Sequence, residues 1–98
     1  MALGPLPGGD FSALGVSATT VIATTPAGGP KRVLVSFNVT TAGAAGALYD
    51  FAATSGFGAA NLICVVPATV GSYTLNWPCS VGIVYVPGAA QVASFSYD

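Results

Sequence analysis

The ionisable side chains of this sequence offer little to acid–base or nucleophilic catalysis. The chain has no histidine and no glutamate, and its carboxylates, Asp10, Asp50 and Asp98, lie far apart in the sequence. General acid–base catalysis needs a group whose pKa lies near the working pH, usually a histidine, a glutamate or a lysine with a shifted pKa. Lys31 is the single lysine, and a Ser-His-Asp triad needs the histidine that the chain lacks. We therefore expect a protein that is not an enzyme.

Asp50 is interpreted as a structural residue. It lies in the segment ALYDFAA, residues 47–53, which alternates as a strand does. On such a strand the carboxylate either faces solvent or pairs with Lys31 or Arg32 on a neighbouring strand.

Two cysteines, Cys64 and Cys79, are the strongest metal ligands in the sequence. Zinc sites usually take four cysteine or histidine ligands, so we expect no metal site and no cofactor. The pair itself allows three states: free thiols, an internal bridge, or a bridge between subunits. An internal bridge would close a loop of about 15 residues and stabilise the fold by about 3 kcal/mol.

Three further patterns could belong to binding sites, and each also has a structural interpretation. Residues 56–61, GFGAAN, begin like a dinucleotide-binding loop but have Asn61 in place of the third glycine, so they are interpreted as a turn. Asn38 begins an N-V-T glycosylation sequon, a pattern that often occurs by chance. Aromatic residues could stack on sugars or bases, or could close the ends of a small β core; they are Trp77, Tyr49, Tyr73, Tyr85 and Tyr97.

The composition points to a protein that is covered by copies of itself or by a partner. Only 5% of the 98 residues are charged while 53% are hydrophobic, whereas soluble monomers usually carry charge at about 25 to 35% of surface positions. Lys31 and Arg32 are the only cations, which excludes a basic nucleic-acid surface. Disorder needs the opposite composition. No apolar run approaches the roughly 18 residues of a membrane span, and the first residues do not look like a signal peptide.

The hydrophobic pattern predicts an all-β domain over residues 16–98. It is a single β-sandwich or jelly-roll-like barrel of about seven strands, because short β segments alternate with Gly- and Pro-rich turns. Val33, Val35, Phe37 and Val39 are expected on one face of a strand, and Gln91, Ala93, Phe95 and Tyr97 on one face of the last strand. The apolar run 61–66 is expected to be buried on both faces. The predicted segments are residues 16–25, 31–40, 47–53, 61–66, 72–77, 83–86 and 91–97.

Residues 1–15 are predicted to form an extended N-terminal arm. Pro5 and Pro7 favour extended backbone, and four glycines discourage an independent element. The segment is either a frayed terminus or an arm that reaches a neighbouring subunit. Its apolar anchors in the second case would be Leu3, Leu6, Phe11 and Leu14.

About two-thirds of the chain, residues 33–97, resembles the small all-β structural proteins of tailed bacteriophage particles, the capsid decoration or cement type. The resemblance rests on LYD at 48–50 before a glycine-rich turn, on PATVGSYTLNWPCSVGIVYVPG at 67–88, and on a last strand that ends in Ser96-Tyr97. Many phage β modules share this pattern, and the two cysteines are not part of it.

The resemblance implies a structural protein of the virion. Such a protein is made in the cytoplasm of the bacterial host, forms homo-oligomers, with a trimer favoured, and binds the major capsid protein on the outer capsid surface. There it stabilises contacts between neighbouring capsomers. The alternatives are a structural component of the tail or a fibre, and a carbohydrate- or receptor-binding β module on the particle. Nucleic acid and membrane are not expected as partners.

Overall fold

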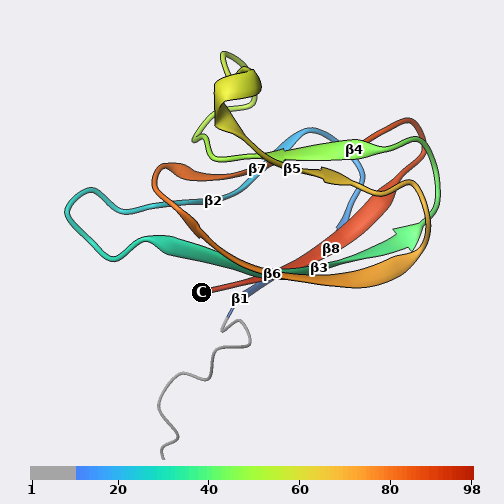
Figure 1. Ribbon diagram of the computed structural model, residues 1–98, viewed down its shortest axis with the longest axis horizontal. Coiled ribbons are helices and arrows are strands. Elements are labelled where there is room, and N and C mark those ends of the chain that lie inside the picture. The colour runs from blue at the N-terminus through green and yellow to red at the C-terminus, as the bar shows by residue number, and fades with distance from the viewer. Residues whose placement is uncertain (1–10) are drawn as a thin grey trace, which may run out of the picture.

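Two antiparallel β-sheets face each other in the computed structural model, which describes residues 11–98 (Figure 1). Sheet A has the strand order β1-β8-β3-β6, and sheet B has the order β2-β7-β4-β5. The expected all-β sandwich is confirmed. The elements are β1 (Phe11–Val16), β2 (Thr20–Thr24), β3 (Arg32–Thr41), β4 (Gly46–Tyr49), the short 3-10 helix η1 (Ala59–Asn61), β5 (Leu62–Val66), β6 (Gly71–Cys79), β7 (Gly82–Val86) and β8 (Val92–Tyr97).

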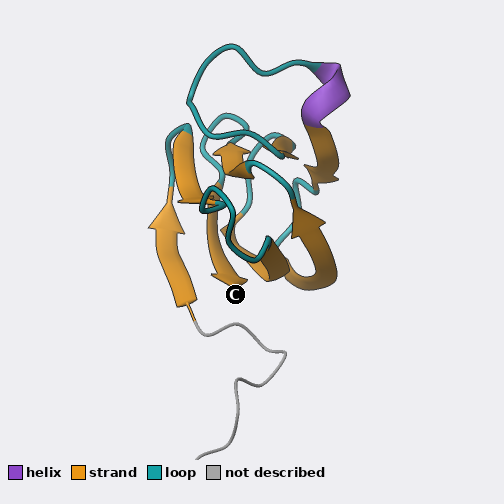
Figure 2. Ribbon diagram, turned by 90° about the vertical axis from the view of Figure 1, so that its left-hand side faces the viewer, coloured by secondary structure: helices purple, strands orange, loops and turns teal. Residues whose placement is uncertain are grey.

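The strand pairing follows the jelly-roll topology. β1 pairs with β8, β2 with β7, β3 with β6 and β4 with β5, all antiparallel. This is the order obtained when one long hairpin folds over itself, with β3–β8 and β4–β7 contacts joining the halves of each sheet. β5 and β6 therefore form one edge of the sandwich, opposite the edge formed by β1 and β2 (Figure 2).

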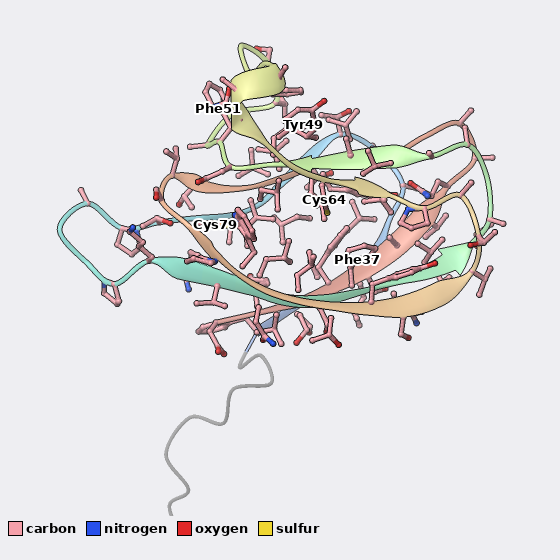
Figure 3. All side chains as sticks on the ribbon, viewed as in Figure 1. Phe37, Tyr49, Phe51, Cys64 and Cys79 are labelled. Atoms are coloured by element: carbon pink, nitrogen blue, oxygen red, sulfur yellow. The ribbon has the colours of Figure 1, made fainter. Side chains whose placement is uncertain are left out.

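The core fills the space between the two sheets. Phe37 lies there with its ring centroid 5.1 Å from that of Tyr73 and 6.2 Å from that of Phe95, and Tyr85 packs on Phe95 at 4.8 Å (Figure 3). The remaining buried members come from six strands, β3 to β8, and complete an apolar layer. They are Leu34, Val39, Leu48, Val66, Cys79, Ile83 and Ala93.

Strand β8 has the predicted alternation, whereas β3 has it only in part. Ala93 and Phe95 point into the core, as expected. Leu34 was expected on the outer face but is fully buried in the core. The reason is a shift of register between Leu34 and Ser36 against both neighbouring strands, which turns the alternation over at this point.

A buried amide joins the turn after β7 to the loop after β5. Gln91 is fully buried, and its Oε1 accepts a hydrogen bond of 2.6 Å from the Tyr85 hydroxyl. Its Nε2 donates to the carbonyl oxygen of Pro67 at 2.8 Å. Because each polar atom of this side chain has a partner, the amide fixes the loop without an unsatisfied group.

One burial prediction and two strand boundaries are wrong. Residues 61–66 were expected to be buried on both faces, but β5 is an edge strand with exposed side chains. Pro78 was expected to end its strand, yet β6 continues to Cys79, because an edge strand tolerates proline. The segment 47–53 ends as a strand at Tyr49.

The predicted boundary of the N-terminal arm at residue 15 falls inside β1. Phe11 pairs with Tyr97 of β8, so this segment is an eighth strand in addition to the seven predicted ones. The sequence hid the strand because its alternation breaks between Ala13 and Val16, where Gly15 has a φ of +60°.

Candidate functional site

Asp50 caps the turn between β6 and β7. Its carboxylate follows β4 directly and accepts three backbone hydrogen bonds: from the N–H of Ser80 at 2.9 Å, of Val81 at 2.7 Å and of Gly82 at 3.0 Å. Pairing with Lys31 or Arg32 was the sequence-based alternative. The direct partners are instead backbone amides, and Lys31 contributes through its charge alone.

The electrostatics of Asp50 keep it ionised and fit a structural role. Burial raises the pKa of this carboxyl, but the N–H groups of Gly82, Val81 and Ser80 and the charge of Lys31 together lower it below the ordinary value of 3.8. A catalytic acid at neutral pH needs the opposite shift. Asp10 lies outside the described residues, and within residues 11–98 no group of three or more metal-ligating side chains occurs.

Both cysteines are free within this chain, so the internal bridge is not formed, and a bridge between subunits stays a prediction. Cys79 is buried, and its Sγ donates a hydrogen bond of 3.6 Å to the carbonyl oxygen of Trp77. Burial, together with the negative charge of Asp50, raises the pKa of Cys79 to about 11. Burial also raises the pKa of Cys64. Since the thiolate is the reactive form, neither residue is prepared for nucleophilic chemistry at neutral pH.

The aromatic side chains do not form a common stacking platform. Trp77 is 47% exposed on the β6 edge. Tyr73 stacks on Phe37 inside the sandwich, and Tyr49 packs on Phe57 with their ring centroids 4.3 Å apart, outside sheet B. Tyr85 is buried, which raises its pKa to about 12. The tyrosines thus close different parts of the fold.

The proposed apolar anchors of the N-terminal arm fall into two groups. Leu3 and Leu6 lie outside the described residues. Phe11 stacks on Tyr97 with ring centroids 5.5 Å apart, and the Arg32 guanidinium lies 5.4 Å from the Phe11 ring, so this side chain has partners in its own chain. Leu14 is 78% exposed. An assembly role for these residues stays a prediction.

The outer face of sheet A carries two rows of small hydroxyl and amide side chains. One row crosses all four strands and the other crosses β8, β3 and β6, because residues that are paired across strands share a face. Asn38 accepts a hydrogen bond of 3.2 Å from Ser72, and a shallow groove of about 220 Å³ runs over this face. The rows are Ser12-Ser96-Ser36-Thr74 and Ser94-Asn38-Ser72.

The outer face of sheet B is aliphatic and aromatic instead. Its alternation places residues opposite to the core-facing Leu48, Tyr85 and Val66 on this outer side. Val84 is fully buried although it faces outward; it lies beside Tyr49, whose ring packs on Phe57 of the β4–β5 loop. The outward rows are Val65-Ala47-Val86 and Leu62-Tyr49-Val84-Val21. Neither row contains a charged residue, a serine or a threonine.

The contrast between these two faces was not predicted, although part of its signal was present in the sequence. Ser94 and Ser96 alternate with core residues, and Ser36 and Asn38 do the same on β3. The rows become visible only when the register joins them across strands that are distant in the chain.

Neither a membrane-spanning helix in the described residues nor a similar known protein points to a role for this chain. In residues 11–98 no helix is long and apolar enough to cross a membrane. Comparison with protein-family models, curated proteins and solved structures finds no match.

Proposed function

We propose that this chain is a structural protein of a virus particle, a decoration protein that binds the outer surface of the capsid, contacts the major capsid protein and stabilises its capsomers. The jelly-roll topology supports the proposal because capsid domains use it, but lectins and cupins use it too. The fold alone therefore does not decide the role, and the surfaces must be considered.

The observation that carries the proposal is the difference between the two outer faces. Apart from the exposed Leu14 at the β1 edge, the paired rows on sheet A carry hydroxyl and amide groups. Sheet B instead exposes Val65 and Leu62 at its β5 edge, with the half-buried Ala47 and Val86 in line with Val65. In a monomer that is surrounded by solvent on every side, an exposed apolar face serves no purpose, because such a face promotes association. A protein held between a shell and solvent needs one face of each kind. We assign sheet B to the particle and sheet A to solvent.

The experiment is a binding assay with purified capsids that lack this protein. Two substitutions are matched: Val86→Lys lies on the outer face of sheet B and Ser36→Lys on the outer face of sheet A, both on inner strands and both half-buried. We expect Val86→Lys to abolish co-sedimentation with capsids and Ser36→Lys to retain it, with circular dichroism confirming that both variants are folded. Equal binding by both variants, or no binding by the unmodified protein, would refute the proposal.

Two alternatives are separated by the same material. A tail or fibre component would bind tails but not empty heads in this assay. A carbohydrate-binding module would bind glycans on an array, and substitution of Trp77 would abolish this binding. Trp77 lies in β6, and its side chain is half-exposed.

A further inference from the structure

We propose that the free edge of β5 pairs in antiparallel fashion with β5 of a second copy of this chain, which joins two copies of sheet B into one continuous sheet. β5 contacts β4 on one side, and no other strand of residues 11–98 lies on its other side. Figure 2 shows this strand directly after the purple turn, at the side of the molecule opposite β1. Such an edge has backbone N–H and C=O groups available for a further strand.

The remaining three edges carry features that oppose pairing. β6 contains Pro78 and the left-handed residue Asn76, with a φ of 51°. β1 is interrupted at Gly15, and β2 shifts its register between Val21 and Ala23. Bulges and prolines of this kind are how natural proteins block edge-to-edge association.

β5 retains a regular stretch that is not blocked in this way. Its own irregularity lies at the start, between the pairs Leu48↔Cys64 and Tyr49↔Leu62, so Cys64–Val66 is regular. The strand contains neither proline nor a charged residue. Two large apolar side chains remain in solvent on it: Leu62 is 42% exposed and Val65 is 59% exposed.

A second copy satisfies this edge better than an unrelated strand because an antiparallel pair is self-complementary about a twofold axis. With Val65 opposite Val65 of the second copy, Cys64 lies opposite Val66 of that copy, and both of these face the core side. The outward row Val65-Ala47-Val86 then continues directly into the same row of the second copy. Charge does not select a different partner or register for β5, because neither β5 nor β4 carries a charged side chain.

The size of the contact sets its strength. Two five-residue strands bury far less than the roughly 800 Å² per partner of a typical stable complex. We therefore expect a dimer that dissociates on dilution, with a dissociation constant in the micromolar range or weaker. On a particle surface the high local concentration of copies would favour the pairing. The expectation that copies are crowded on a particle rests on the proposed function, and the pairing names a second copy as the partner of β5 there.

Engineered disulfides test the register directly. Directly opposed residues of antiparallel strands have Cα atoms about 4.5 or 5.5 Å apart, which lies within the range that a disulfide spans. Val65→Cys is introduced together with Cys64→Ser, and the protein is treated with copper phenanthroline in air. Two Cu(II) ions take up the two electrons of each new disulfide, oxygen reoxidises the resulting Cu(I), and the buffer takes up the two protons. The matched control is Val70→Cys in the same background, because Val70 is 61% exposed but lies before β6.

We expect a covalent dimer on non-reducing gels with Val65→Cys, formed severalfold faster than with Val70→Cys and reversed by reductant. Equal rates for the two variants, or no dimer with Val65→Cys, would overturn the pairing. A second measurement uses the solution mass by light scattering after size exclusion at high concentration. Val65→Lys places like charges opposite each other and should yield a monomer, whereas Val70→Lys should retain the dimer.

The two proposals fail in different ways. If the solution mass were that of a trimer and the trimer persisted in Val65→Lys, the twofold pairing would be overturned. The capsid assay with Val86→Lys would be unaffected by that result. Loss of capsid binding by the unmodified protein, with the Val65→Cys dimer still formed, would instead refute the decoration role alone.

Discussion

Replacing Asp50 by alanine tests whether this carboxylate stabilises the β6–β7 turn. Three backbone N–H groups donate to it at 2.7 to 3.0 Å. Hydrogen bonds to a charged group contribute about 1.5 to 3 kcal/mol each, but solvent reaches this site, and screening reduces the sum to about 2 kcal/mol. For a domain of this size that loss lowers the melting temperature by roughly 8 to 16 °C.

The pH dependence separates this account from a mere loss of packing. The folded pKa of Asp50 is lowered, so the carboxylate stabilises the fold above the ordinary value of 3.8 and loses this effect as the pH falls through the folded pKa. Urea titrations at pH 7 and near pH 2 should therefore show a stability difference between Asp50→Ala and the unmodified protein that is larger at pH 7 than near pH 2. Lys31→Gln, which removes only a nearby charge, is the control and should cost much less. A difference that is the same at both pH values would refute the reasoning.

Four other outcomes are expected. Gln91→Leu should destabilise the fold by about 2 to 4 kcal/mol in urea titrations, because the Tyr85 hydroxyl loses its buried acceptor, and adding Tyr85→Phe should recover part of the loss. Phe37→Asp should give no folded protein by circular dichroism, since it places an unpaired charge in the core. A thiol reagent should modify Cys64 before Cys79, and Cys79 only on unfolding; simultaneous modification would contradict its burial. Self-association measured by sedimentation should be retained or increased when sodium sulfate is added, whereas a contact based on charge would weaken.

The fold class could be predicted because its signal is local. Alternating core and surface residues over β8, and turn residues between short β segments, are visible in a single stretch of sequence. β1 was missed because Gly15 interrupts its alternation, and Leu34 was placed on the wrong face because a bulge adds a residue where the period is two.

The position of a strand within its sheet could not be predicted from its own residues. The run Leu62–Val66 is as apolar as a central strand, and Gly82–Val86 is such a strand, yet the first lies at an edge and the second is buried. What separates them is the order of strands, which depends on pairing between distant segments. The same is true of the hydroxyl rows on sheet A, whose members are joined only by the register.

The low charge of the chain and the unlike outer faces have one common physical consequence. With so few charged side chains, solubility depends on the hydroxyl face of sheet A, and the aliphatic face and open β5 edge of sheet B have no charges to prevent association. An added charge on sheet B should therefore change assembly far more than the same charge on sheet A. The Val86→Lys and Ser36→Lys pair measures that difference at the face, and Val65→Lys and Val70→Lys measure it at the edge. If both pairs behaved alike, the contrast between the sheets would have no part in assembly.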